Sequence, residues 1–598
     1  MKTTKIPARN EIPEQDKWDL SSLYLQESDW EMDLTLLPDL AKEILSYKGK
    51  LSESPDTLRN ALDTYCRLLM IFETTGAYAF LLTAGDAENP ENQNKYGRYI
   101  MAATAAEAEI SFFVPELQSI DEKLLQEWCE RPDFNDYKIY LSKLSRLKPY
   151  ILSEKEEKIL SLESESATAC QKSFSMLTNV DINYGKVRTE AGLLPLTQTT
   201  WSSFMENPDR NVRKAAYNKF YKAFDQHKNT IASLYAGSVQ HDIFEAKARG
   251  YKSAREMALF PDKVPESVYD NLVSTVRENL APLHKYYALR KELLGLKDLR
   301  HYDVYVPLVK DIKKITPYND AVAILKHALS PLGEDYTSIL CDGLLNGWVD
   351  RYENKGKRSG AFSEGVYIGN PYILMNYKED VLRDVFTLAH EGGHSMHTWY
   401  SSHSNAFMHY NYTIFEAEVA STFNEQLVFE YLLNNTDDKN LKKYLICNRA
   451  SDIIATLYRQ TMFAEFEHKA HTLVESGTPL SADVLRKEYR NLLETYFGPE
   501  MIFEKTSDLE GLRIPHFYNA YYVYKYATGI SAALALSNRV LKGGAKEKED
   551  YFTFLRSGGS RYPIESLKVA GVDMNESKPI KDAIDTFAKL VNQIENFN

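Results

Sequence analysis

The sequence predicts a mainly α-helical protein, and three observations support this prediction. Apolar residues recur at intervals of three and four over several long stretches, as they do on one face of a helix. Stretches that alternate polar with apolar residues, or that gather glycine, are few and short. The chain has 598 residues, of which 44% are apolar and 26% charged, and this composition can fill the cores of two or more domains.

Two long helices are expected first, in the stretches that begin at Ser54 and at Asn92, and we expect them to pack against each other in antiparallel fashion. The stretch from Asp181 to Trp201 alternates and contains glycine and proline, which predicts a short hairpin and a domain boundary. We therefore expect an N-terminal helical domain over residues 1–195 and a second domain over residues 196–598, where helical periodicity resumes.

A second interruption runs from Asn354 to Asp380 and has a glycine-rich turn followed by β-prone residues. It predicts a small sheet and lacks the residue order of a phosphate-binding loop. The segment that follows, "EDVLRDVFTLAHEGGHSMHTWYSS", is again periodic, with Val385 and Leu388 on an apolar side. We expect the sheet to precede a helix that carries several histidines.

Charge and cysteine content exclude several classes of protein. The formal net charge is −13 and the basic residues are scattered, so no basic stripe for nucleic acid is present. The N-terminal segment is polar and we find no apolar run of membrane-spanning length, so we expect a cytoplasmic protein that does not bind a membrane. Five cysteines lie far apart without a CxxC pair, which predicts buried thiols instead of disulfides or a thiolate zinc site.

The stretch "TLAHEGGHSMHTW", residues 387–399, contains an HExxH motif. On a helix, His390 and His394 lie one turn apart on the same face, where two imidazoles can bind one zinc ion. Glu391, next to the first histidine, can reach a metal-bound water without binding the metal. Each of the two glycines between the histidines destabilises a helix by about 1 kcal/mol relative to alanine. A purely structural helix therefore has little reason to keep them.

A catalytic zinc site needs a third protein ligand, and the segment from Asn411 supplies Glu416, Glu418 and Glu425 on a second expected helix. Glu418 and Glu425 lie two turns apart on one face. We favour Glu418 as the ligand and Glu425 as the acceptor for the second ring nitrogen of a ligating histidine. His397 is the runner-up ligand, or else lines the pocket, because one helix rises about 10 Å over seven residues.

Several segments together resemble the oligoendopeptidase F branch of the M3, or thimet oligopeptidase, family of zinc peptidases. They are "FTLAHEGGHSMHTWYSS", "FEAEVASTFNEQL", "RIPHFYNAYYVYKYATG", "RKAAYNKFYKAF", "YKSAREMALFPDKVPESVYDNL" and "KGKRSGAFS". The match extends from about Asp181 nearly to the C-terminus. One position departs from that branch: Gly392 stands where a bulkier residue is more common.

The resemblance implies a helical ellipsoid with a deep substrate channel between two helical walls, of which residues 1–195 form one. It implies one zinc ion per chain near the channel floor, Glu418 as third ligand, and hydrolysis of internal bonds in short peptides. It also implies that His516 and Tyr524 donate hydrogen bonds to the oxyanion of the tetrahedral intermediate. The spacing leaves Tyr518, Tyr521 and Tyr522 as competitors for that role. Tyr518 and Tyr521 are also expected to bind substrate.

Glu391 is expected to take the proton of the attacking water and to pass it to the leaving amine. The strand near Tyr372 is expected to pair with an extended peptide as an edge strand. A related HExxH metallo-carboxypeptidase stays an alternative, although the sequence shows no evident cationic residues to bind the terminal carboxylate of a substrate. A non-enzymatic helical scaffold that binds peptides is the second alternative. The sequence does not predict the oligomeric state.

Overall fold

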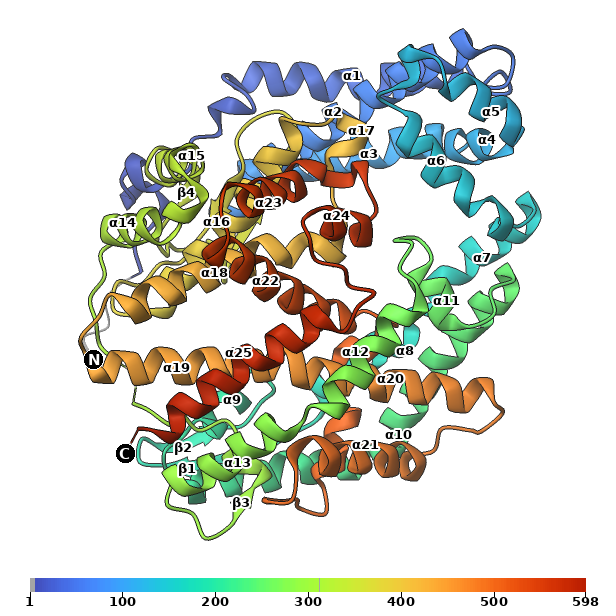
Figure 1. The fold of residues 1–598 in the computed structure, drawn as a ribbon. Helices are drawn as coiled ribbons and strands as arrows, with labels where there is room; N and C mark the ends of the chain where they lie inside the picture. The colour runs from blue at the N-terminus through green and yellow to red at the C-terminus, as the bar shows by residue number, and fades with distance from the viewer. Residues whose placement is uncertain (1–5, 311, 598) are drawn as a thin grey trace. The chain divides into compact units, whose positions relative to one another are not determined.

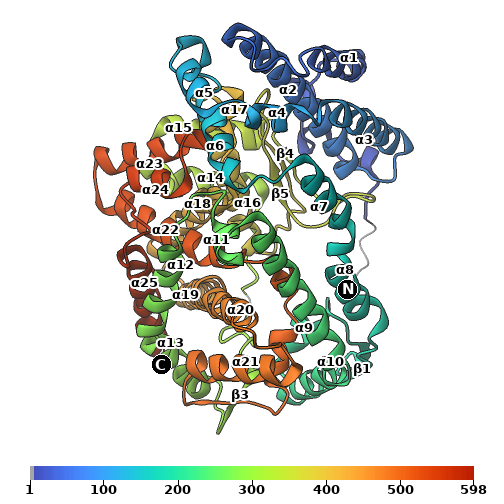
Figure 2. The same ribbon diagram turned by 90° about the vertical axis from the view of Figure 1, so that its right-hand side faces the viewer.

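The structure is a computed structural model that describes residues 6–310 and 312–597. Most of these residues are helical, and the strands are short (Figures 1 and 2). The predicted mainly α class with a small sheet is therefore confirmed. The contacts within the chain divide it into two compact units, each made of three separate stretches. The first unit consists of Met1–Pro149, Lys313–Asn435 and Leu536–Val572. The second unit consists of Tyr150–Ile312, Thr436–Ala535 and Asp573–Asn598. The division into domains at residues 195 and 196 stays a prediction.

The first unit contains the histidine helix. Its helices are α1 (Glu27–Leu45), α2 (Pro55–Gly85), α3 (Pro90–Ile110), α4 (Phe113–Ser119), α5 (Glu122–Cys129), α6 (Lys138–Leu147), α14 (Tyr318–Ala328), α15 (Glu334–Leu345), α16 (Arg383–Ser402), α17 (Phe407–Tyr410), α18 (Ile414–Asn434), α23 (Ala545–Ser557) and α24 (Pro563–Val569). Its strands are β4 (Val349–Asp350), β5 (Phe362–Glu364) and β6 (Tyr372–Leu374).

The second unit is also helical. Its helices are α7 (Glu154–Ala167), α8 (Ala169–Met176), α9 (Trp201–Met205), α10 (Arg210–Arg249), α11 (Ala254–Leu259), α12 (Glu266–Glu278), α13 (Ala281–Leu293), α19 (Lys439–Ile453), α20 (Arg459–Glu475), α21 (Ala482–Phe497) and α25 (Lys578–Glu595). Helix α22 (Tyr524–Lys542) begins in this unit and ends in the first. Strands β1 (Lys186–Thr189) and β2 (Gly192–Pro195) form the predicted hairpin, and β3 (Leu299–Arg300) pairs with β7 (Met501–Ile502).

The two expected N-terminal helices are α2 and α3, which pack against each other and against α1. By length and composition alone, α2 could cross a membrane, since its most apolar window has a mean hydropathy of 1.4. The expectation of no uninterrupted apolar run of that length is not overturned, because Arg67 and Glu73 interrupt the apolar residues of α2. Half of that window is buried inside the structure, where residues such as Leu62 and Leu68 join the core, and a core helix passes the same test.

Helices α16 and α18 pack closely, and Gly393 explains how they can. A Cβ atom built on Gly393 would lie 2.5 Å from the Cα of Ser421 and 2.6 Å from the carbonyl oxygen of Ala420, both on α18. Only glycine allows this approach. A Cβ atom on Gly392 would instead meet Leu340 Cδ1 at 3.1 Å, which is the end of a flexible side chain.

The predicted small sheet precedes α16 and has the strand order β4-β6-β5. Strand β6 pairs in parallel with β4 and antiparallel with β5, so it is the central strand. Tyr372 of β6 is fully buried, and its hydroxyl hydrogen-bonds with Ser22 and with the Asp19 carbonyl. The prediction of an edge strand near Tyr372 is therefore wrong, and the role of Tyr372 in substrate binding stays a prediction. Strand β5, which like β6 contacts α16, lies at an edge of the sheet.

Candidate metal centre and its cavity

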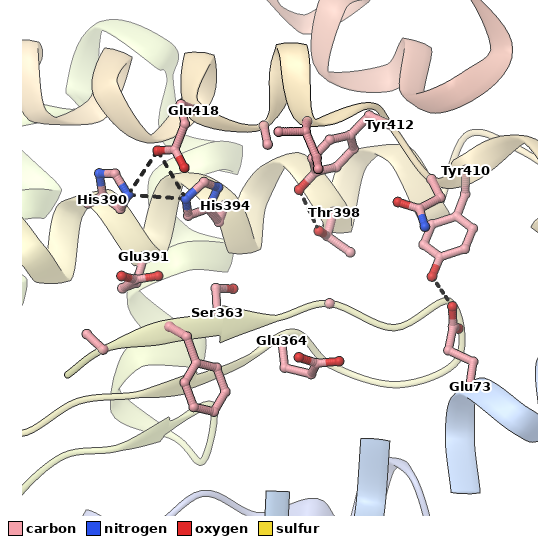
Figure 3. A pocket seen from close by; sticks show the side chains of 16 residues that line it. Glu73, Ser363, Glu364, His390, Glu391, His394, Thr398, Tyr410, Tyr412 and Glu418 are labelled. Atoms are coloured by element: carbon pink, nitrogen blue, oxygen red, sulfur yellow. Dashed lines mark hydrogen bonds and ion pairs between the residues drawn. The ribbon is translucent and has the colours of Figure 1, made fainter. Parts of the chain in front are cut away.

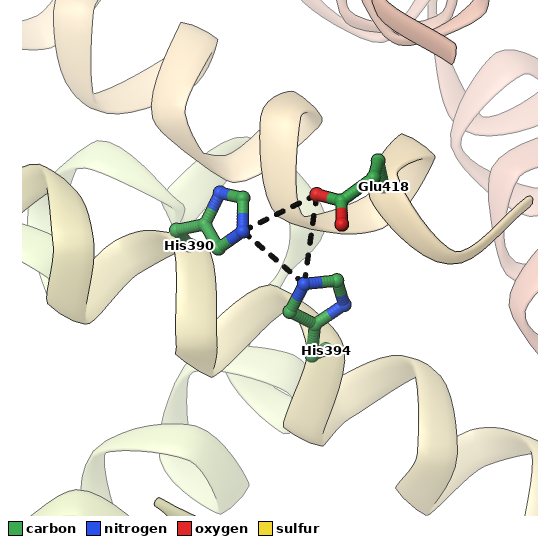
Figure 4. Close-up of side chains that lie close together, drawn as sticks. All are labelled: His390, His394 and Glu418. Carbon is green, nitrogen blue, oxygen red and sulfur yellow. Dashed lines mark hydrogen bonds and ion pairs between the residues drawn. The ribbon is translucent and has the colours of Figure 1, made fainter. Parts of the chain in front are cut away.

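Three side chains of the first unit converge between α16 and α18: His390, His394 and Glu418 (Figure 4). The Nε2 atoms of the two histidines lie 3.2 Å apart. Glu418 Oε2 lies 3.3 Å from Nε2 of His390 and 3.7 Å from Nε2 of His394. The spacing of four residues on α16 places both imidazoles on one face, and the close packing of α18 brings the carboxylate over them.

This donor set fits a divalent metal ion such as zinc. Two imidazole nitrogens and one carboxylate oxygen are the ligand types of catalytic zinc sites, which leave a fourth position open. Tetrahedral bonds of about 2 Å place ligand atoms roughly 3.3 Å apart, close to the separations among the three donors. The sequence-predicted set of His390, His394 and Glu418 is thus the set that the fold brings together.

The outer ring nitrogens of the histidines also have acceptors. Nδ1 of His390 lies 2.5 Å from Oε1 of Glu425, whereas the other ring nitrogen, Nε2, faces Glu418. The backbone of Ala417 is a hydrogen-bond partner of His394. Such partners hold an imidazole in the orientation and tautomer that a metal needs. Glu416, the third candidate carboxylate, is buried elsewhere and accepts a hydrogen bond from Thr413.

The charges of the three groups depend strongly on one another. Burial lowers the pKa of His390, but the carboxylates of Glu418 and Glu425 outweigh it and raise that pKa well above its usual value. Burial and the charge of His390 lower the pKa of His394 to about 4. Burial raises the pKa of Glu418, but the two imidazoles outweigh it and lower that pKa to about 2. Glu418 is therefore ionised and His394 neutral, whereas His390 must lose its proton when a metal ion binds.

His397 lies outside this group, although it shares the helix. Its ring is fully buried and stacks on Tyr412, with ring centroids 3.6 Å apart and planes 6° apart. Neither ring nitrogen has a hydrogen-bond partner among the described residues, and burial lowers the pKa of His397 to about 3. It packs behind Tyr412, which lines the cavity described next.

The three donors line a cavity of about 650 Å³ in the first unit (Figure 3). Glu391 also lines it, opposite β5, and accepts a hydrogen bond from the backbone of Ser363 on that strand. Burial raises the pKa of Glu391 to about 7, with the charges of Glu418 and Glu425 adding to the effect and that of His390 opposing it. The Ser363 side chain hydrogen-bonds with Ser395 at 2.9 Å, which ties β5 to α16.

Several lining residues were not singled out from the sequence, among them Glu73, Glu364, Thr398, Tyr410 and Tyr412. Glu73 comes from α2, and its carboxylate accepts hydrogen bonds from the Tyr410 hydroxyl and the Tyr367 backbone amide. The Thr398 and Tyr412 hydroxyls lie 3.0 Å apart. For Glu364, the stretch "GAFSEG" was an indication in the sequence, because its β-prone residues predict a strand close to the motif helix.

The predicted oxyanion donors belong to the second unit. His516 is exposed in a short 3-10 helix, Pro515–Tyr518, and its ring lies 6.4 Å from that of Tyr522. Tyr524 is buried at the start of α22, where its ring lies 5.2 Å from that of Tyr269. The roles of His516 and Tyr524 stay predictions.

The other tyrosines of this segment differ in their surroundings. Tyr518 stacks on Phe174 with ring centroids 4.7 Å apart. Tyr521 is buried and has a positive φ of 55°, which is rare for a residue with a side chain. Its backbone amide donates a hydrogen bond to the buried Glu467 at 2.8 Å. The backbone at Tyr521 is thus held in an unusual conformation by a carboxylate.

Comparisons with known proteins show the family to which the chain belongs. The model of peptidase family M3 matches residues 203–586, and that of oligopeptidase F matches residues 116–184. An oligoendopeptidase F homolog of Borreliella burgdorferi is 42% identical over 98% of this chain and 99% of its own length. The crystal structure of oligoendopeptidase-F from Enterococcus faecium matches with a TM-score of 0.73 and 31% identity, covering 96% of this chain and 99% of that one. Oligopeptidase PepF of Bacillus subtilis is 41% identical over 99% of this chain and 89% of its own length.

Proposed function

Because the chain belongs to peptidase family M3 and is a metalloendopeptidase, we propose that it hydrolyses internal bonds of short, unstructured peptides with one zinc ion per chain. The observation that supports this most directly is the position of Glu391: its carboxylate shares one cavity with the His390, His394 and Glu418 donors. The cytoplasmic location expected from the sequence is part of the proposal.

His390, His394 and Glu418 would hold the zinc ion, and Glu425 would fix the ring of His390 through its Nδ1 atom. When bound, zinc supplies a Lewis acid that polarises a carbonyl group and makes water a nucleophile near neutral pH. His397 has no part in this binding, because it packs against Tyr412 instead.

Glu391 would act as the general base and then as the general acid. Its carboxylate accepts one proton from the attacking water while the water oxygen bonds to the carbonyl carbon of the peptide. When the C–N bond breaks, the same group gives that proton to the leaving nitrogen, so the residue ends as it began. The Ser363 backbone holds the carboxylate over the cavity throughout. His516 and Tyr524 are proposed as donors to the oxyanion, with Tyr518, Tyr521 and Tyr522 as competitors.

The substrate is proposed to bind as an extended chain along β5 instead of β6. One side of β5 pairs with β6, and residues 361–365 line the cavity. A strand at the edge of a sheet can pair with a peptide backbone, and this gives affinity without demanding particular side chains. A cavity of about 650 Å³ accommodates a few residues of such a chain but no folded protein.

The proposal can be tested with a series of peptides of increasing length that are blocked at both ends, and with reduced casein as a long unfolded substrate. We expect internal cleavage of peptides on the order of ten residues and little digestion of casein, because ordering a long flexible chain is costly. Glu391→Gln keeps the shape and is the matched inactive control. Efficient digestion of casein would indicate an open-cleft protease, and release of single terminal residues a carboxypeptidase.

A further inference from the structure

One carboxylate in the cavity takes no part in the proposed chemistry. Glu364 is the last residue of β5 and directly follows Ser363, whose backbone hydrogen-bonds with Glu391. It lines the same cavity as the metal donors, on the strand that leads toward Glu73 (Figure 3). Adjacent residues of a strand are about 3.3 Å apart, so Glu364 lies a short, fixed distance along β5 from the strand residue that contacts Glu391.

Glu364 differs from its acidic neighbour in what it contacts. Glu73 accepts hydrogen bonds from the Tyr410 hydroxyl and from the Tyr367 amide at 2.7 Å. In the part of the chain that the structure describes, Glu364 accepts no hydrogen bond and forms no ion pair within 4 Å. Its side chain is partly exposed where it lines the cavity, so a cationic group that enters the cavity can reach this carboxylate. A hydrogen bond between two charged groups is stronger than one between neutral groups, which favours such a cation.

The charges around Glu364 strengthen this preference. Burial and the negative charge of Glu73 together raise the pKa of Glu364 to about 7, against the opposing charge of Arg358. The effect of Arg358 is the smallest of the three, so the residues around Glu364 leave its negative charge uncompensated. An ammonium or guanidinium group in the cavity would compensate it and would also interact with Glu73.

We propose that Glu364 is a specificity-determining residue that binds one positively charged group of the peptide substrate and thereby fixes which bond is cleaved. The inference rests on the proposed peptidase function and on binding of the peptide along β5. The charge is either a lysine or arginine side chain or the free N-terminal ammonium. Because Glu364 is one residue from Ser363, the cation should lie within about two substrate residues of the cleaved bond.

The test uses the full-length, zinc-loaded protein and decapeptides that are acetylated, amidated and uncharged except for one lysine. The lysine is moved one position at a time, and each peptide has a twin with norleucine at that position. We expect lysine at one fixed distance from the cut to raise kcat/KM roughly tenfold or more over the norleucine twin, as a hydrogen bond to a charged group would. The cut site, identified by mass, should move with the lysine.

Two variants separate charge recognition from damage to the fold. Glu364→Gln keeps the shape and should bring the ratio of kcat/KM for the lysine peptide over its norleucine twin close to one, whatever its activity on the norleucine series. Glu109→Gln removes the same charge from an exposed position on α3 outside the cavity and should keep the effect. Glu364→Lys should prefer a glutamate in place of the lysine.

A further arm identifies the source of the charge. Peptides without lysine but with a free N-terminus should be cleaved at the same fixed distance from that end if the terminal ammonium is bound. The inference alone would be overturned if lysine and norleucine peptides were cleaved equally and the cut also kept no fixed distance from a free N-terminus. A charge effect that survives in Glu364→Gln would overturn it as well. If the unaltered protein cleaves no peptide of either series, the proposed function itself is wrong.

Discussion

Gly393 of α16 lies so close to Ser421 of α18 that a Cβ atom at position 393 would lie 2.5 Å from the Ser421 Cα. This contact holds the helix of His390 and His394 against the helix of Glu418, so that three donors from two helices meet. The motif glycine next to the second histidine is thus a packing requirement of the metal centre.

Gly393→Ala should therefore destabilise the protein by about 1–3 kcal/mol or more, because the backbone of α18 must move, and it should also weaken metal binding. Gly392→Ala is the matched control. Its Cβ atom meets only the end of Leu340, and alanine favours the helix, so its stability should change by less than about 1 kcal/mol. Urea unfolding and metal content measure both effects, and equal behaviour of the two variants would contradict this account.

Glu425→Gln tests the partner of His390. The amide cannot provide the negative charge that faces Nδ1 at 2.5 Å, so affinity for zinc should fall by roughly ten- to a hundredfold. Glu430→Gln, five residues further along α18, changes the same group where it accepts a hydrogen bond from Gln426 instead of a metal-binding histidine, and should leave the affinity unchanged. Competition with a chelator measures both affinities. An unaltered affinity in Glu425→Gln would show that Glu425 does not support the metal.

Tyr524→Phe tests the predicted oxyanion donor. Loss of one donor should lower kcat by about a hundredfold or more with a smaller effect on peptide affinity. The same substitution at Tyr522 is the comparison, because both tyrosines belong to the segment "PHFYNAYYVYKY". Steady-state kinetics on one blocked peptide distinguishes them. If Tyr522→Phe shows the large loss and Tyr524→Phe does not, the assignment moves to Tyr522.

Glu467 should make stability depend on pH. Burial raises the pKa of Glu467 to about 8 in the folded protein, against about 4.3 in an unfolded chain. The folded state therefore binds the proton more tightly, so the stabilisation is fully present below about pH 4 and is lost as the pH rises through about 8. Glu467→Gln keeps an acceptor for the Tyr521 amide but cannot ionise.

From pH 5 to pH 8.5, the unaltered protein should thus lose more stability than Glu467→Gln, by roughly 4 kcal/mol. Urea unfolding at pH 5, 7 and 8.5 gives the comparison. Parallel curves for the two proteins would show that the Glu467 carboxylate titrates alike in both states.

The metal donors could be predicted because their geometry is local. The spacing of His390 and His394 is a property of one helix, and Glu418 and Glu425 share a face of the next. The helical class and the hairpin near Lys186 follow from periodicity in the same way.

The rest depends on contacts between distant parts of the chain. The edge position of β5 follows from the strand order, so a sequence pattern could not show that Tyr372 lies on the central strand. Glu73 reaches the cavity from α2, 294 residues before its partner Tyr367, and no spacing indicates such a contact. The sequence around Glu364 predicts a strand, but it does not show that this strand lines a cavity.

The zinc content of purified Glu418→Ala and His397→Ala tests the central claim most directly. The unaltered protein should bind one zinc ion per chain, and Glu418→Ala should lose most of it, because one of three protein ligands is gone. His397→Ala should retain it, since that ring packs against Tyr412 outside the donor group. If His397→Ala lost the metal while Glu418→Ala kept it, the metal centre described for this peptidase would be wrong.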